Sequence, residues 1–143
     1  MTAEERKAIQ ERHQAAREKL CGVCAQLFPD VIHWDTEAME MLSVFHTDEQ
    51  MENTRGWLHG GLIATIFDNG LGILADAHAG GDSAPTSSIH VEYLRPVPLM
   101  VPLYLHAKIV KLGRTLIHVR GELLDAAENG KTLAAATGIF FRC

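Results

Sequence analysis

The chain has 143 residues, 47% of them apolar and 22% charged, with a formal net charge of −5 at pH 7. This balance predicts one soluble globular domain, and the scattered Lys and Arg residues argue against sequence-independent nucleic-acid binding, which needs a basic face. No apolar run approaches the length of a membrane span, and Glu4 and Glu5 stand where a secretory or transit signal would be basic, so we expect a cytoplasmic protein.

The first predicted element is an amphipathic helix over residues 3–28, which Phe28-Pro29-Asp30 ends. We expect it to dock on another surface, as an extension (1–30) that precedes the main domain (31–143). It contains Cys21-Gly22-Val23-Cys24, a spacing found in redox and zinc sites. Because no second metal pair and no βαβ pattern accompanies them, we interpret these cysteines as reduced thiols that face the core.

The next predicted elements are a strand within residues 37–47 and a buried helix over residues 59–79. The first segment is ambiguous, because its start has helical propensity whereas Leu42, Val44 and Phe45 favour a strand. From Leu62 to Ala75, apolar positions cover nearly the whole circumference of a helix, and Gly80-Gly81 is typical of a helix end.

The remainder of the chain is predicted to form four strands. Alternating apolar residues mark strands at 89–93, 103–110, 117–123 and 133–141, and turns at Gly113 and at Asn129-Gly130 connect the last three. Small residues in the last strand, Ala134 to Ala136 and Gly138, would let a helix lie close to the sheet. The predicted fold class is α+β, with one antiparallel sheet wrapped around a single long helix.

Asp68 is the exception in the predicted buried helix. A carboxylate there loses hydration unless it is paired or faces a cavity, and a cavity would suit it to general-base or nucleophilic action. His59-Gly60-Gly61 stands at the helix start, where a backbone N–H can stabilise a developing oxyanion. The alternatives without a catalytic role are that Asp68 caps a turn or faces solvent and that His59 only starts the helix. Small residues near Asp68 would leave room for a substrate: Ala64, Thr65 and Gly72.

An ordered set of motifs over residues 37–142 resembles the hotdog-fold acyl-CoA thioesterases, specifically the branch similar to the phenylacetate-pathway (PaaI-like) enzymes. Asn53 stands six positions before His59, and Asp68 stands nine positions after it. The other matching motifs are His59-Gly60-Gly61, Tyr93-Leu94-Arg95-Pro96 and Lys111-Leu112-Gly113-Arg114-Thr115. The N-terminal helix lies outside this resemblance.

The resemblance implies hydrolysis of an acyl-CoA without a cofactor or metal. Gly60 would offer its N–H to the thioester oxygen, and Asp68 would attack the carbonyl or activate a water. Asn53 and His59 would help to hold the carbonyl or the departing thiol. Thr86 stands where relatives often carry a hydroxyl that orients the water.

Three basic residues are candidates for contacts to coenzyme A. Lys111 and Arg114 belong to one hairpin, which either binds the phosphate groups or is simply a solvated turn. Arg95, in the third motif, is the further candidate.

Other interpretations remain open. A hydratase or dehydratase of acyl thioesters has a similar fold, but its Asp-x-Asn-Pro-x-His motif is absent from this sequence. A non-catalytic acyl-CoA-binding module would have lost the carboxylate. His90, His106 and His118 could meet across the sheet, although polar-face positions are the better interpretation. The acyl group is not determined, and the candidates for the pocket wall are Trp57, Phe45 and Phe67.

The spacing of Gly60 and Asp68 predicts a site shared between two chains. Eight residues along one helix separate their backbones by about 12 Å, too far for both to act on one carbonyl group. Two antiparallel helices across a two-fold axis bring the start of each beside the middle of the other. We therefore expect a homodimer, with a homotetramer through the outer sheet face or the N-terminal helix as an alternative.

Overall fold

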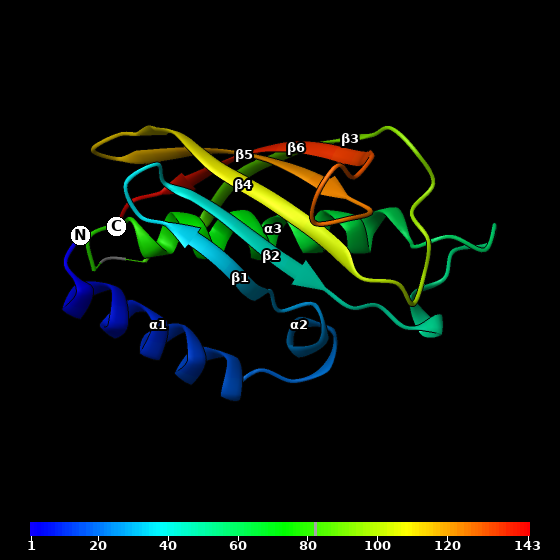
Figure 1. The fold of residues 1–143 in the computed structure, drawn as a ribbon, viewed down its shortest axis with the longest axis horizontal. Helices are drawn as coiled ribbons and strands as arrows, with labels where there is room; N and C mark the ends of the chain where they lie inside the picture. Colours follow the sequence, from blue (N-terminus) through cyan, green and yellow to red (C-terminus); the bar gives the residue numbers. More distant parts are fainter. Residues whose placement is uncertain (82) are drawn as a thin grey trace.

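The computed structural model describes residues 1–81 and 83–143, and its elements follow the order in Figure 1. The helices are α1 (Ala3–Glu18), α2 (Gly22–Gln26), the 3-10 helix η1 (Glu49–Met51) and α3 (Gly60–Ala77). The strands are β1 (Asp30–Asp35), β2 (Glu40–Phe45), β3 (Thr86–Tyr93), β4 (Leu103–Leu112), β5 (Leu116–Leu124) and β6 (Thr132–Phe141). Within these ranges, no helix combines the length and apolarity needed to cross a membrane.

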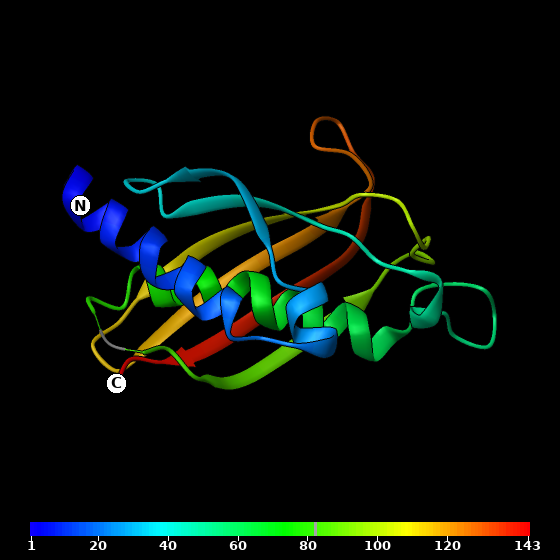
Figure 2. The ribbon, with the colours of Figure 1, turned by 90° about the horizontal axis from the view of Figure 1, so that it is seen from below.

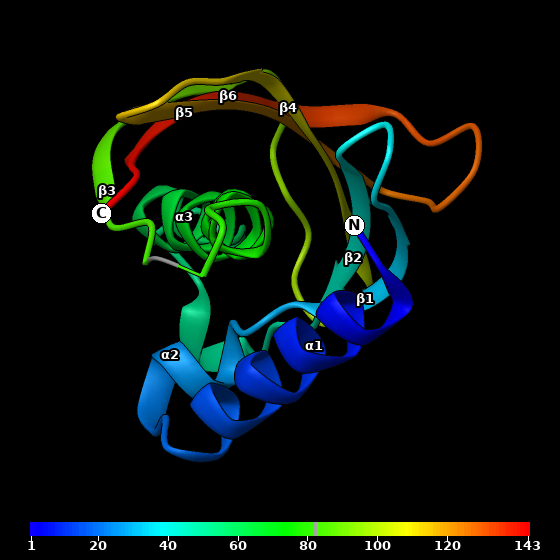
Figure 3. The same ribbon diagram turned by 90° about the vertical axis from the view of Figure 1, so that its left-hand side faces the viewer.

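The six strands form one antiparallel sheet in the order β1-β2-β4-β5-β6-β3, which curves around α3 (Figure 3). Alternate side chains of β4, namely Leu103, Leu105, Ala107 and Ile109, are buried on the inner face. The sheet-facing side of α3 contributes Ile66, Phe67, Leu71 and Leu74, which are all fully buried. This arrangement confirms the predicted α+β layout of a sheet wrapped around one long helix.

Three glycines, which have no side chain, allow α3 to lie close to the sheet. A Cβ on Gly70 would lie 2.1 Å from Leu105 Cδ2, and a Cβ on Gly121 of β5 would lie 2.7 Å from Leu71 Cδ2. Gly138 of β6, one of the small residues that the sequence singled out, also faces Leu71, at 3.2 Å from its Cδ1. Packing at this density fixes the position of the helix, and with it the position of every residue that α3 carries.

The prediction of one helix over residues 3–28 is wrong. The chain leaves α1 after Glu18 and begins α2 at Gly22, whose φ of +63° is a conformation that L side chains rarely adopt. The prediction of core-facing thiols is also wrong, because Cys21 and Cys24 are both exposed. Helical spacing of apolar residues continued past this break, so periodicity alone did not reveal it.

Strand β1 was not predicted from the sequence. It pairs with β2 through Trp34 opposite Met41 and Asp35 opposite Glu40. The intervening turn is held by Asp35, whose Oδ1 accepts hydrogen bonds from the backbone N–H groups of Glu37 and Ala38 at 3.0 and 2.9 Å. The predicted strand within residues 37–47 is confirmed for Glu40–Phe45.

The N-terminal segment packs beside α3 on the side away from the sheet (Figures 2 and 3). Arg12 Nη2 and His13 Nε2 lie 2.8 and 2.9 Å from Asp76 Oδ2 of α3. Asn69 Nδ2, also on α3, donates to the Leu27 carbonyl at 2.8 Å. No residue of α1 is fully buried, and its attachment combines these polar contacts with the partly buried Ile9, which packs against the core.

Candidate active site

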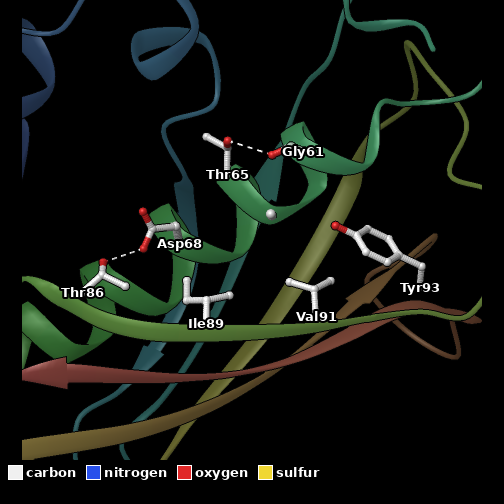
Figure 4. Close-up of a pocket in the computed structure, with 8 residues that line it drawn as sticks. Gly61, Thr65, Asp68, Thr86, Ile89, Val91 and Tyr93 are labelled. Atoms are coloured by element: carbon white, nitrogen blue, oxygen red, sulfur yellow. Dashed lines mark hydrogen bonds between the residues drawn. The ribbon is translucent and has the colours of Figure 1, made fainter.

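A hollow of about 490 Å³ lies between α3 and the edge strand β3 (Figure 4). We call it the site hollow; it is lined by Gly61, Ala64, Thr65, Asp68, Thr86, Ile89, Val91 and Tyr93. The four α3 residues follow the three- and four-residue spacing that places side chains on one stripe of a helix. Ile89, Val91 and Tyr93 alternate along β3, so they share one face of that strand. Ala64 and Thr65 thus border the space that the sequence suggested.

Asp68 and Thr86 meet in this hollow although they are 18 residues apart. Thr86 Oγ1 donates to Asp68 Oδ1 at 2.6 Å, a length typical of a hydroxyl bound to a charged carboxylate. Asp68 is half-buried, and its second oxygen points away from Thr86 (Figure 4). The hydrogen bond therefore orients the carboxylate and leaves one oxygen available.

His59 caps α3 through its side chain. Its Nδ1 accepts a hydrogen bond from the Gly61 backbone N–H at 3.1 Å. This contact agrees with the alternative that His59 starts the helix. A neutral ring that accepts through Nδ1 carries its hydrogen on Nε2. The exposed His59 ring can therefore still offer a donor at the start of the helix.

Tyr93 is a site residue to which sequence reasoning assigned no role. Its hydroxyl donates to the Gly60 carbonyl at 2.7 Å, so it ties the first turn of α3 to the end of β3. For the Gly60 N–H itself, no acceptor occurs among the described residues. The available signal was the position of Tyr93 at the head of the Tyr93-Leu94-Arg95-Pro96 motif.

Asn53 shapes the loop that leads into α3. Its Oδ1 accepts from the backbone N–H groups of Arg55 and Trp57 at 2.8 and 3.1 Å. A shallow hollow of about 340 Å³ brings Asn53, Trp57, Gly60, Tyr93 and Arg95 together. Two predicted site residues, Asn53 and Gly60, and one predicted coenzyme A contact, Arg95, thus lie at the same end of α3.

Other predicted residues lie elsewhere within one chain. Lys111 and Arg114 belong to the β4–β5 hairpin, which Arg142 ties to the opposite end of α3 by donating to the carbonyls of Ala79 and Gly113, both at 3.1 Å. Phe45 and Phe67 are buried in the core at 1% and 0% exposure, so the structure contradicts their interpretation as pocket-wall residues. Their side chains pack between α3 and the sheet instead.

The three strand histidines do not form a cluster. Strand β6 separates β3, with His90, from β5, with His118. His106 of β4 lies 3.5 Å from Glu40 Oε2 on the neighbouring strand. In residues 1–81 and 83–143, no group of three or more His, Cys, Asp or Glu side chains is placed to hold a metal ion.

Comparison with known proteins identifies the family. Residues 55–130, more than half of the chain, match the model of the thioesterase superfamily. The chain belongs to this superfamily. Bovine acyl-coenzyme A thioesterase THEM4 is 27% identical over 116 residues, which cover 80% of this chain and 46% of that protein. The chain spans about half the length of the curated relatives it matches.

Solved structures share the fold. The Escherichia coli PaaI protein, from the phenylacetic acid degradation operon, aligns with a TM-score of 0.78 and 21% identity over 94% of this chain and 93% of its own. The smu.793 protein of Streptococcus mutans, solved bound to acetyl CoA, aligns with a TM-score of 0.69 and 23% identity over 79% and 86% of the two chains. The predicted hotdog fold and the resemblance to PaaI-like thioesterases are thereby confirmed.

Proposed function

We propose that this chain is an acyl-CoA thioesterase, which hydrolyses its substrate to a free acid and coenzyme A. The carrying observation is the Asp68 carboxylate, oriented by Thr86 at 2.6 Å in a hollow beside a helix start. Membership of the thioesterase superfamily and the name of the bovine relative support the same reaction.

In the proposed reaction, a water oxygen bonds to the thioester carbon while its proton passes to Asp68. The Gly60 N–H, at the positive end of the α3 dipole, stabilises the oxyanion. The carbon–sulfur bond then breaks, and the departing thiolate takes up the proton that Asp68 holds, which restores the carboxylate. Direct attack by Asp68, which would form an anhydride that water later hydrolyses, is the alternative. Asn53 and His59 help to hold the carbonyl or the departing sulfur.

Two chains complete each site in this proposal. Gly60 and Asp68 both lie on α3, about 12 Å apart along its axis, so one helix cannot present both to the same carbonyl group. Strand β3 borders the site hollow. Among residues 1–81 and 83–143 it pairs only with β6, and it stands at the end of the sheet order. A second copy can pair with this free edge and set its α3 antiparallel to the first. A homodimer with two equal sites results, and pairing of dimers into a homotetramer is the further alternative.

The same pairing gives the basic residues a role. It makes the end of one α3, with Lys111 and Arg114 nearby, extend past the start of the other, on the side of the dimer that holds the partner subunit's Arg95. These cations meet the phosphate groups of coenzyme A. Replacing both Lys111 and Arg114 by Ala should raise KM several-fold for CoA thioesters, by about 1 kcal/mol of binding or more, and less for thioesters that lack the nucleotide. An equal rise for both substrate types would contradict a nucleotide contact.

The direct test is release of free thiol from a panel of acyl-CoAs, from acetyl to long-chain and aromatic, by the purified chain. A thioesterase releases thiol in proportion to acid formed. A hydratase would change the absorbance of enoyl-CoA without releasing thiol, and a binding module would do neither. Absence of thiol release across the panel would overturn the proposed activity.

Subunit mixing tests the shared site. Asn53→Ala and Asp68→Asn, each inactive alone, are denatured and refolded together. A heterodimer places both lesions in one site and leaves the other intact, so up to about a quarter of unmodified activity should return with random pairing. No recovery in verified heterodimers would mean that each chain carries a complete site.

A further inference from the structure

A second hollow, of about 440 Å³, adjoins the site hollow on the side of the N-terminal segment. We call it the α1 hollow. Its walls come from α3, from the chain around β3 and β6, and from the N-terminal segment, which contributes Arg12, His13, Ala16 and Phe28. Figure 2 shows the N-terminal helices α1 and α2, in blue, running along the green helix α3.

The two hollows share the candidate reacting group. Asp68 and Thr86 line both of them, so one molecule can reach from one into the other past the carboxylate. Gly72, one turn after Asp68, also lines the α1 hollow, where it presents no side chain and a Cβ would lie 3.4 Å from Phe140 Cε1. A substrate whose carbonyl lies at Asp68 therefore has space for its acyl group along this flank of α3.

An ion cluster lines the α1 hollow one helix turn and more beyond Gly72. Asp76 Oδ2 lies 2.8 Å from Arg12 Nη2 and 2.9 Å from His13 Nε2. Burial alone would raise the pKa of Asp76, but hydrogen bonds from His13 and Arg12 outweigh it and hold that pKa below its ordinary value. The cluster is thus a charged wall against which an apolar chain has no reason to extend.

The distance along α3 sets the size of the space. Asp68 and Asp76 are eight residues apart, which corresponds to about 12 Å of helix. At about 1.5 Å per carbon–carbon bond, a chain of about eight carbons extends at most about 10 Å. The walls before the cluster include the apolar side chains of Ala16, Phe28 and Phe140.

We propose that the α1 hollow holds the acyl group of the substrate and that α1 is its far wall. The N-terminal segment, which precedes the family-matched residues 55–130, then limits the acyl group to about eight carbons. This inference rests on the proposed thioesterase function. Ala16 is the specificity-determining position, since its small side chain leaves room that a larger one would fill.

The test compares Ala16→Phe with a matched control, Ala15→Phe. Both residues are exposed on α1, but Ala15 lines neither hollow, so the control carries the same chemical change outside the proposed wall. Circular dichroism and urea unfolding establish that both variants are folded. Two readouts follow: kcat/KM for octanoyl-CoA relative to acetyl-CoA, and calorimetric binding of the non-hydrolysable thioethers octyl-CoA and ethyl-CoA.

Ala16→Phe should lower the octanoyl to acetyl ratio at least about tenfold, whereas Ala15→Phe should leave it near that of the unmodified chain. An unchanged ratio in folded Ala16→Phe, or an equal fall in both variants, would overturn the proposal that α1 is the wall of the acyl site. The thioesterase proposal would still stand. If the unmodified chain released no thiol, the proposed function would fail. Binding of the two thioethers would then test whether the α1 hollow holds an acyl group. A loss of octyl-CoA affinity in Ala16→Phe but not in Ala15→Phe would support an acyl site in the α1 hollow. Equal octyl-CoA affinities of the two variants would overturn it.

Discussion

The two flanks of α3 differ sharply although they belong to one helix. On the sheet-facing flank, Phe67, Leu71 and Leu74 have 0% exposure, and Gly70 lets Leu105 approach directly. On the flank toward β3, Thr65 and Asp68 are only partly buried and border a hollow. The sequence predicted apolar residues around nearly the whole circumference and singled out Asp68 as the exception, and the structure places that exception on the partly open flank.

The difference shows how packing and proposed chemistry coexist on 18 residues of helix. Each large side chain on the sheet-facing flank contributes roughly 1.5–3 kcal/mol of stability by its burial. That flank holds the helix rigid, so the polar groups on the other flank keep their positions without contributing much to stability. Substitutions on the two flanks should therefore separate activity from stability.

The largest expected effect is on turnover. Asp68→Asn is nearly isosteric, so the free energy of unfolding should stay within about 0.5 kcal/mol of that of the unmodified chain. If the carboxylate provides acid–base or nucleophilic catalysis, kcat should fall at least about a hundredfold, which is about 2.7 kcal/mol. Thiol release and urea unfolding measure the two quantities, and full activity in the folded variant would remove Asp68 from the proposal.

Two substitutions of Thr86 separate the effect of its hydroxyl on activity from the effect of its shape. Thr86→Val keeps the shape and loses the hydrogen bond to Asp68 Oδ1, whereas Thr86→Ser keeps the hydroxyl. We expect kcat to fall about tenfold for Val and to remain within about threefold for Ser, since one charge-assisted hydrogen bond contributes about 1.5–3 kcal/mol. If the two variants were equally impaired, the methyl group rather than the hydroxyl would be the important feature.

Two glycines of α3 should respond with opposite signs. At Gly70, a Cβ would lie 2.1 Å from Leu105 Cδ2, so Ala should overpack the core and cost a net of about 1 kcal/mol after its better helix propensity is counted. At Gly72, where the first contact is 3.4 Å, Ala should gain up to about 1 kcal/mol. Urea unfolding measures both. A stabilised Gly70→Ala would show that Leu105 can move aside.

The smallest expected effect concerns the end of α3, where Trp34 Nε1 donates to His78 Nε2 at 3.1 Å. Burial, with a smaller effect of the positive N-terminus, lowers the pKa of His78, so the unfolded chain takes up this proton first. The contribution of neutral His78 is therefore complete above the unfolded pKa of about 6.5 and is lost as the pH falls toward the folded pKa.

His78→Gln keeps an acceptor for Trp34 and removes the titration. Between pH 7.5 and 5, its free energy of unfolding should fall less steeply than that of the unmodified chain. The difference is bounded by about 1.4 kcal/mol per pH unit for one group. Urea unfolding at several pH values measures the two slopes, and parallel slopes would assign the pH dependence to other groups.

Much of the proposed site was predictable from the sequence because its signals are local. His59-Gly60-Gly61 marks a helix start by its residue types, and Asp68 stands out because a carboxylate interrupts an apolar helix. The position of Thr86 followed from the family resemblance. Its hydrogen bond to Asp68 depends on how β3 lies against α3, which no local pattern encodes.

The sequence by itself determined which segments form the core strands and the central helix, because apolar periodicity depends only on neighbouring residues. Only the tertiary structure decided which side of each element is covered. Phe45 and Phe67 became core residues, Cys21 and Cys24 became exposed, and β6 came to lie between β5 and β3. The physical reason is that burial and sheet order arise from contacts between distant segments, whereas periodicity constrains each segment alone.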